Sequence, residues 1–130
     1  MIAFLILIPR KKGMTRKQFM DYYEHVHVPL VQKIMPPLNF YRRNYLMTPY
    51  SYTKDEAPLS FDVITEIRFE DRITADDWFA KWMSEPIRKI IIPDEMNHVD
   101  RENIRVVEVD FHGSLETVVL PIGSISLSIS

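Results

Sequence analysis

The chain has 130 residues, of which 46% are hydrophobic and 26% are charged, a balance typical of one globular domain with its own core. It has no cysteine and only 3 glycines, which excludes disulfides, thiolate metal sites and thiol nucleophiles and argues against a glycine-rich nucleotide-binding loop. A net charge of −2 gives no electrostatic reason to bind nucleic acid.

The first predicted element is a strand from Ile2 to Pro9, because nearly every residue in it is apolar, as in a strand covered on both faces. Its apolar run, Ile2 to Ile8, is much shorter than a membrane span and lacks the basic start and cleavage site of a signal peptide. We therefore expect a cytoplasmic protein with no membrane partner.

A helix is predicted from about Thr15 to about Ile34. Thr15 followed three residues later by Gln18 matches a capping box, which satisfies backbone donors of the first turn. Spacings of three and four place on one face Phe19, Tyr22, Tyr23, Val26, His27, Leu30 and Ile34. On that face, His27 is either an acid or base that works near neutral pH or a core histidine with a satisfied hydrogen bond.

Two strands are predicted after this helix. Pro36-Pro37 ends the helix, and a strand follows from about Phe40 to Met47. The segment 48–60 has the length and composition of an exposed connection that often serves as a lid. Strict alternation predicts the next strand over 61–69, with Asp62 and Glu66 on the same face.

A second helical region is predicted before the last strand. Thr74 is the expected cap of a helix that carries Trp78 and Trp82 inward. A further helical piece follows Pro86, and Pro93 is expected to open another turn. The last strand is predicted over 103–111. The element order predicts an α+β, ferredoxin-like β-α-β-β-α-β fold with an antiparallel sheet.

Such a sheet carries its helices on one face, so the other face needs a second cover, which self-association supplies. We assign residues 1–112 to the domain and 113–130 to a C-terminal extension. The alternating apolar and serine residues over 125–130 are typical of an added strand, in the same subunit or exchanged with a neighbouring one, but a frayed terminus is an equal alternative.

Several motifs agree in order and spacing with one protein family. The first predicted helix and the two residues before it contain Gly13-Met14-Thr15, Phe19, Tyr22-Tyr23 and His27-Val28-Pro29-Leu30. Further along the chain stand Arg43-Asn44-Tyr45, Phe61 to Glu66, Asp94-Glu95 and Asp100-Arg101. Over about residues 2 to 111 the chain resembles the EthD family of the dimeric α/β-barrel superfamily. It departs from the family pattern at His98, where relatives commonly carry an aromatic residue.

The resemblance implies a homodimer whose two sheets face each other, with a ligand cavity between sheet and helices in each subunit. Related dimeric α/β-barrels include cofactor-free monooxygenases, polyketide cyclases, muconolactone isomerases and accessory proteins, so the fold does not choose among activities. EthD-type proteins often resemble tailoring enzymes for aromatic polyketides in secondary metabolism.

If the first helix borders such a cavity, His27 is the predicted general acid or base and Asp62 its carboxylate partner. His98 is a further catalytic candidate. The predicted substrate-binding residues are Tyr23, Tyr45, Glu66, Trp78 and Trp82. For the aromatic residues the alternative is a place in the core, and for Glu66 it is a pair with Arg68 on a solvated strand face. No spacing of histidines on a helix points to a metal, so none is expected.

We therefore expect a cofactor-independent enzyme of the cyclase, dehydratase, isomerase or decarboxylase type. It would act on an aromatic polyketide-like molecule or a cyclic ketone, with His27 removing an acidic proton next to a carbonyl. One alternative is a non-catalytic protein that binds a hydrophobic metabolite, and another is a cofactor-free monooxygenase. The expected partners are a small hydrophobic aromatic substrate and a second copy of the chain.

Overall fold

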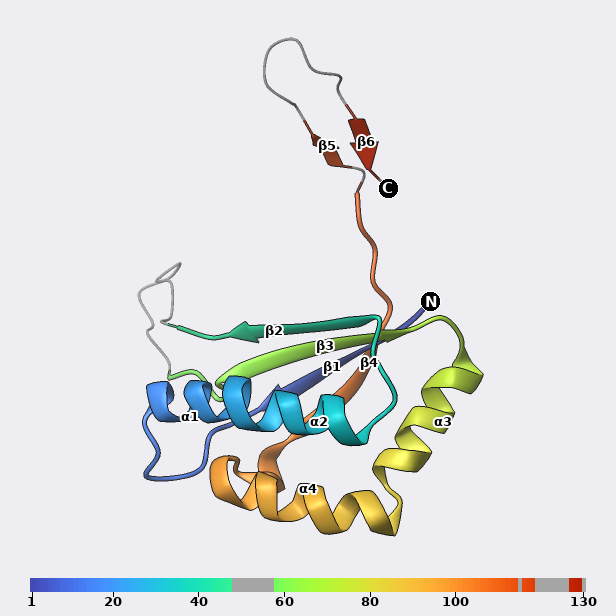
Figure 1. Cartoon of the computed structure of the whole chain (residues 1–130). Helices are drawn as coiled ribbons and strands as arrows, with labels where there is room; N and C mark the ends of the chain where they lie inside the picture. Colours follow the sequence, from blue (N-terminus) through green and yellow to red (C-terminus); the bar gives the residue numbers. More distant parts are fainter. Residues whose placement is uncertain (48–57, 115, 119–126, 130) are drawn as a thin grey trace.

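A computed structural model describes residues 1–47, 58–114, 116–118 and 127–129. Four strands form one antiparallel sheet in the order β2-β3-β1-β4. Their bounds are Ile2–Ile8 for β1, Phe40–Tyr45 for β2, Val63–Phe69 for β3 and Arg105–Val109 for β4. The helices lie together on one face of this sheet (Figure 1). The predicted α+β, ferredoxin-like fold with an antiparallel sheet is therefore confirmed.

The helical unit after β1 consists of α1 (Arg16–Tyr22), one π-helical turn (Tyr23–His27) and α2 (Val28–Ile34). Its start confirms the capping box. The hydroxyl of Thr15 accepts the N–H of Gln18 at 3.1 Å, and the side-chain oxygen of Gln18 accepts the N–H of Thr15 at 2.9 Å.

The π-helical turn changes which residues face inward. The N–H of Val28 donates to the carbonyl of Tyr23, five residues back, so this turn holds one residue more than an α-turn. Tyr23 and His27 are both buried, whereas Val26 is 46% exposed. The predicted inner face is therefore wrong at Val26, because a regular 3.6-residue period does not continue through this turn.

The second helical region consists of α3 (Arg72–Trp82) and α4 (Glu85–His98). The cap of α3 is Asp71, whose carboxylate accepts the N–H of Thr74 at 2.8 Å, so the predicted cap at Thr74 is wrong. Pro93 lies inside α4 and does not open a new turn. Proline removes one helix donor, but Ile91 and His98 on either side of it are fully buried, and this packing keeps the helix continuous.

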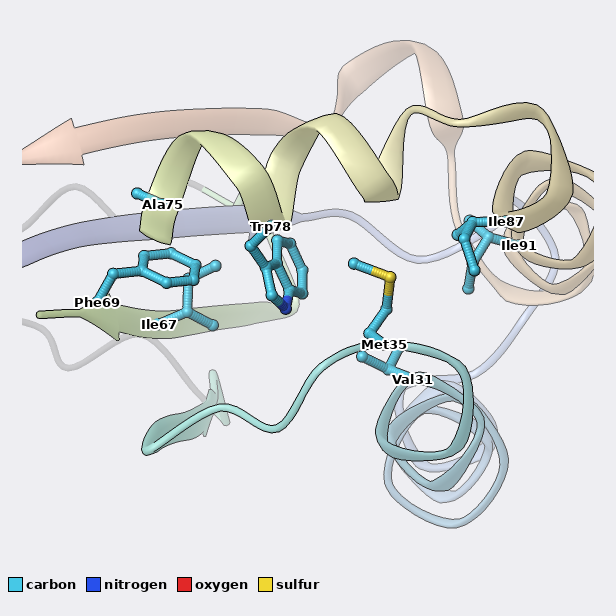
Figure 2. Packing of buried hydrophobic residues seen from close by; sticks show 8 residues of the cluster. All are labelled: Val31, Met35, Ile67, Phe69, Ala75, Trp78, Ile87 and Ile91. Carbon is cyan, nitrogen blue, oxygen red and sulfur yellow. The ribbon is translucent and has the colours of Figure 1, made fainter. Parts of the chain in front are cut away.

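The main hydrophobic core joins α2, α3 and α4 to β3. Figure 2 shows the indole of Trp78 beside the ring of Phe69, with ring centroids 5.8 Å apart. The buried members of this cluster are Val31, Met35, Ile67, Phe69, Ala75, Trp78, Ile87 and Ile91. A second cluster, which includes Phe19 and Tyr23, packs the helical unit against the other end of β1 and β3.

Two predicted segments, the lid and the C-terminal extension, fall partly outside the residues that the structure describes. Within the predicted lid, residues 48–57 lie outside the described residues, as do 119–126 of the extension. In the extension, β5 (Glu116–Val118) and β6 (Leu127–Ile129) pair with each other in a separate two-stranded antiparallel sheet. The division into 1–112 and 113–130 stays a prediction.

In the described part of the chain, no helix combines the length and apolar character needed to cross a membrane.

Candidate active site

A cavity of about 250 Å³ lies between the helix-bearing face of the sheet and the helices. Most of its wall is apolar and aromatic. The apolar wall includes Ile6, Ile8, Val31, Leu38, Tyr41, Ile67, Trp78, Phe79, Trp82, Val99, Ile104 and Val106. A concave wall of this kind favours a small, flat, hydrophobic molecule, and a few polar groups then fix its orientation.

His27 stands in the cavity wall and is held by Asp94 of α4, which is 67 residues away in the sequence. The Nδ1 atom of His27 is 2.5 Å from Oδ2 of Asp94, and the two side chains are only 9% and 3% exposed. The hydroxyl of Tyr22 donates to the other carboxylate oxygen, Oδ1, at 3.0 Å. Asp94 thus receives a hydrogen bond on each oxygen.

The ionisation of Asp94 fixes the proton on His27. Burial alone would raise the pKa of Asp94, but the hydrogen bond from His27, the nearby imidazoles and the Tyr22 hydroxyl outweigh it and lower the pKa. An ionised carboxylate only accepts hydrogen bonds, so Nδ1 of His27 carries the proton that it donates. The other ring nitrogen of neutral His27, Nε2, is then a proton acceptor.

His98 lies beside this pair and is completely buried. Its Nδ1 is 2.7 Å from the main-chain carbonyl of Asp94, and because a carbonyl only accepts, Nδ1 carries the proton. The ring packs against Tyr22 and His27, with centroids 4.4 and 5.2 Å away. Burial lowers the pKa of His98 to about 4, so the ring is neutral at pH 7.

Glu95 also lines the cavity and follows Asp94 directly in α4. Its Oε1 lies 3.7 Å from a guanidinium nitrogen of Arg88 and 3.6 Å from one of Arg101, beyond hydrogen-bond distance. Burial raises the pKa of Glu95. Asp94 and Glu95 are thus neighbouring carboxyl groups whose surroundings shift their pKa values in opposite directions.

A pair of hydroxyl groups completes the polar part of the wall. The hydroxyls of Tyr23, from the π-helical turn, and Thr65, from β3, are 2.7 Å apart, and both residues line the cavity. Burial raises the pKa of Tyr23, so its hydroxyl keeps its proton at neutral pH. The cavity wall therefore contains the predicted residues His27, His98, Tyr23, Trp78 and Trp82.

Asp62 is not the partner of His27, and this prediction is corrected. Its Oδ2 accepts the main-chain N–H of Arg10 at 2.8 Å, and the guanidinium groups of Arg10 and Arg16 lie 3.6 and 3.7 Å from Oδ1. Asp62 precedes β3 at the end of the sheet where β1 leaves it, so it binds the loop that follows β1. The carboxylate that bonds to His27 is Asp94, not Asp62.

Glu66 and Tyr45 also lie outside the cavity wall. Glu66 pairs with Leu5 across the sheet, on the face without helices, and accepts a hydrogen bond from Arg68 at 2.5 Å. The hydroxyl of Tyr45 donates to Glu24 at 2.5 Å, where Arg43 binds the same carboxylate. The predicted substrate contacts of Glu66 and Tyr45 are therefore replaced by contacts within the protein.

Sequence reasoning missed Asp94, Glu95 and Thr65 as site residues. In the sequence, Asp94-Glu95 is recognised only as one of the family motifs, which gives it no role. No pattern of neighbouring residues links it to His27. The alternation over 61–69 places Thr65 on the strand face opposite to Asp62 and Glu66, among apolar residues. That face borders the cavity, so a hydroxyl on it was the available signal.

Ligand atoms of His27, Asp94 and His98 lie within 4.8 Å of one another, a spacing that a metal ion can bridge. The 2.5 Å between His27 and Asp94 is, however, shorter than the ~3 Å or more that separates two ligands of one tetrahedral zinc ion. We therefore interpret this contact as a hydrogen bond. The absence of a metal and of a cofactor stays a prediction.

Comparisons with known proteins agree with this architecture. No curated protein matches the chain. The crystal structure of an EthD family protein, BH0200 from Bacillus halodurans C-125, is similar with a TM-score of 0.58 and 16% identity, and the match covers 86% of this chain and 100% of that one. The crystal structure of At3g17210 from Arabidopsis thaliana gives a TM-score of 0.57 and 11% identity over 88% and 98%.

At these identities the structural likeness shows the fold alone. The sequence profile of the EthD domain matches residues 11–102, which is more than half of the chain and includes the His27–Asp94 pair. The chain therefore belongs to the EthD family.

Proposed function

We propose that this protein is a cofactor-independent enzyme that uses general acid–base catalysis on an aromatic polyketide-like molecule or a cyclic ketone. The reaction is a cyclisation, dehydration, isomerisation or decarboxylation. The observation that supports this proposal is the hydrogen bond between His27 and an ionised Asp94 at the wall of a largely apolar cavity. A base held in one tautomer beside a hydrophobic binding space suits proton removal from a carbon acid.

In a cyclisation, dehydration or isomerisation, Nε2 of His27 first takes a proton from a carbon next to a carbonyl group; in a decarboxylation, loss of carbon dioxide forms the enolate and His27 only transfers protons afterwards. The electron pair of the C–H bond moves to the carbonyl oxygen and forms an enolate. Asp94 stabilises the imidazolium that results, because its carboxylate stays bonded to Nδ1. Tyr22 holds the other oxygen of Asp94 and so fixes the orientation of the pair.

The Tyr23–Thr65 pair supplies a hydrogen-bond donor to the enolate oxygen. The two hydroxyl groups carry two protons and share one hydrogen bond, so one O–H remains for a ligand in the cavity. A donor placed where negative charge develops lowers the barrier to proton removal. The proton on His27 then returns to the substrate at another position or to its leaving group.

The test replaces His27 by alanine and compares it with His25→Ala, which removes an exposed histidine from the same turn. Both variants are incubated with a panel of aromatic polyketides and cyclic ketones, and products are followed by mass and absorbance. We expect His27→Ala to lose about 100-fold or more in rate, as is usual for a general base, while His25→Ala stays near the native rate.

Other results would assign another function. Unchanged turnover in His27→Ala would remove this residue from the mechanism. Ligand-dependent thermal stabilisation without any chemical change would indicate a binding protein. Oxygen uptake on addition of substrate would indicate a monooxygenase.

We further propose that two copies associate through the sheet face that carries no helices. Leu5 and Val107 stand opposite each other on this face, and Val107 is 46% exposed. Val107→Asp should shift the mass measured by light scattering from dimer to monomer, because it places a charge in an apolar interface. Ile90→Asp is the control, since Ile90 is 43% exposed on a helix. A monomeric native protein would contradict this proposal.

A further inference from the structure

Two buried acceptor atoms in α4 have no hydrogen-bond partner among the described residues. They are Oε1 of Glu95 and Nε2 of His98, which lie three residues apart, one helical turn along the same helix. Buried polar atoms are nearly always bonded, so each exception needs an explanation. Both residues line the cavity, so a molecule in the cavity is the explanation that we pursue.

The missing partner of Nε2 of His98 must be a hydrogen-bond donor, and the same holds for Oε1 of Glu95 when this carboxyl group is ionised. Nδ1 of His98 already donates to the carbonyl of Asp94, which leaves Nε2 as a lone-pair acceptor. The ring is surrounded by aromatic side chains, with Phe19 stacked at 5.8 Å and Tyr22 at 4.4 Å between centroids. Oε1 of Glu95 has cations nearby only at 3.6 and 3.7 Å, beyond hydrogen-bond distance.

We propose that the cavity selects hydroxylated aromatic molecules, whose O–H groups donate to His98 and Glu95. His98 is then a specificity-determining residue, and the ligand carries phenolic or enolic hydroxyls at the end of the cavity near α4. This inference rests on the cavity being the ligand site of the proposed function, but it does not require His27 to catalyse a reaction.

The discrimination comes from the unpaired acceptors. A ligand with a suitably placed hydroxyl forms the bond that the folded protein lacks, whereas the same ring without the hydroxyl leaves the acceptor unpaired. A site with buried polar groups therefore rejects an analogue that cannot bond to them more strongly than a purely apolar pocket would. The aromatic wall contributes equally to both ligands and does not discriminate between them.

His98→Phe is the matched variant for this idea. Phenylalanine keeps a flat ring among Phe19, Tyr22 and Tyr23 and removes only the ring nitrogens. We expect this variant to fold, because it removes an unpaired buried acceptor from an aromatic environment. Glu95→Gln is the second variant, since its amide retains the shape of the carboxylate but replaces one acceptor oxygen by a donor.

The experiment measures dissociation constants for 2-naphthol and naphthalene by amide NMR titration of the native protein and both variants. We expect the native protein to bind 2-naphthol at least about 10-fold more tightly than naphthalene. In His98→Phe or Glu95→Gln this preference should fall to about threefold or less, while naphthalene binds as in the native protein.

The remaining outcomes overturn the inference. An equal preference in the native protein and both variants would leave the cavity as a ligand site but remove His98 and Glu95 from recognition. No preference in the native protein would show that water or the surrounding protein satisfies the acceptors. If neither probe binds the native protein, the inference fails together with the cavity's role as ligand site in the proposed function.

Discussion

The two ends of the cavity are built in different ways. The apolar end comes largely from α3, where Trp78, Phe79 and Trp82 are close in sequence and the two indoles stack with centroids 5.5 Å apart. The polar end joins His27 to Asp94 across 67 residues. The hydrophobic effect is non-directional, so an apolar side chain can pack against many different neighbours. A buried charged group, in contrast, needs particular atoms as hydrogen-bond or ion-pair partners. At the first end the loss of stability follows the apolar volume that is removed, whereas the second end depends on each contact.

The largest expected loss of stability is at the apolar end. Trp78→Ala removes a large side chain that is only 6% exposed, and we expect a loss of about 4 kcal/mol in the free energy of unfolding. Ile73→Ala, at a 73% exposed position of the same helix, is the control and should change it by less than about 0.5 kcal/mol. Urea denaturation measures both. Similar losses in the two variants would show that α3 does not anchor the core.

At the polar end, Asp94→Ala leaves His27 and Tyr22 without their buried acceptor. We expect the free energy of unfolding, measured by urea denaturation at pH 7, to fall by about 3 kcal/mol. Removing one partner of a buried pair leaves the other buried without a hydrogen-bond partner. Asp94→Asn keeps one acceptor oxygen and should lose less. A loss below about 1 kcal/mol in Asp94→Ala would mean that the pair is not tightly coupled to the fold.

The third prediction concerns acid. In the folded protein burial lowers the pKa of His98 to about 4, while an unfolded chain protonates histidine near pH 6.5. As the pH falls through this window, the unfolded state binds a proton that the folded state excludes, so the contribution of His98 makes the native protein less stable. His98→Phe lacks this group and should gain about 2 kcal/mol relative to the native protein between pH 8 and pH 5.

Urea denaturation at the two pH values measures this change. His27, Asp94 and Glu95 surround His98 or adjoin it in α4, and all three are retained in the variant, so the comparison isolates the imidazole. A constant difference in stability between the variant and the native protein at both pH values would show that His98 is protonated as readily when folded as when unfolded.

Local patterns predicted the parts of the fold that local chemistry determines. The Thr15–Gln18 capping box and the alternation in β3 were read correctly, because each depends on residues within a few positions. The cap of α3 and the continuity of α4 through Pro93 were not, because in each case a neighbouring residue or tertiary packing outweighs the local signal.

The candidate site was predicted in part for the same reason. His27 and the inward tryptophans follow from helical spacing, but the partner of His27 depends on how α4 crosses the helical unit. Two carboxylates, Asp62 and Asp94, were available in the sequence. Only the three-dimensional arrangement shows that Asp62 binds Arg10 instead.

The π-helical turn at 23–27 sets the rotation of α1 relative to α2. Its additional residue brings Tyr23 and His27 to the cavity while Phe19 before it and Val31 after it stay in the core. If the same residues formed a regular α-helix without this turn, α1 would be rotated by about 100° relative to α2. Phe19 would then leave the core or His27 would leave the cavity, so a graft of this helix onto another scaffold must carry the irregular turn intact.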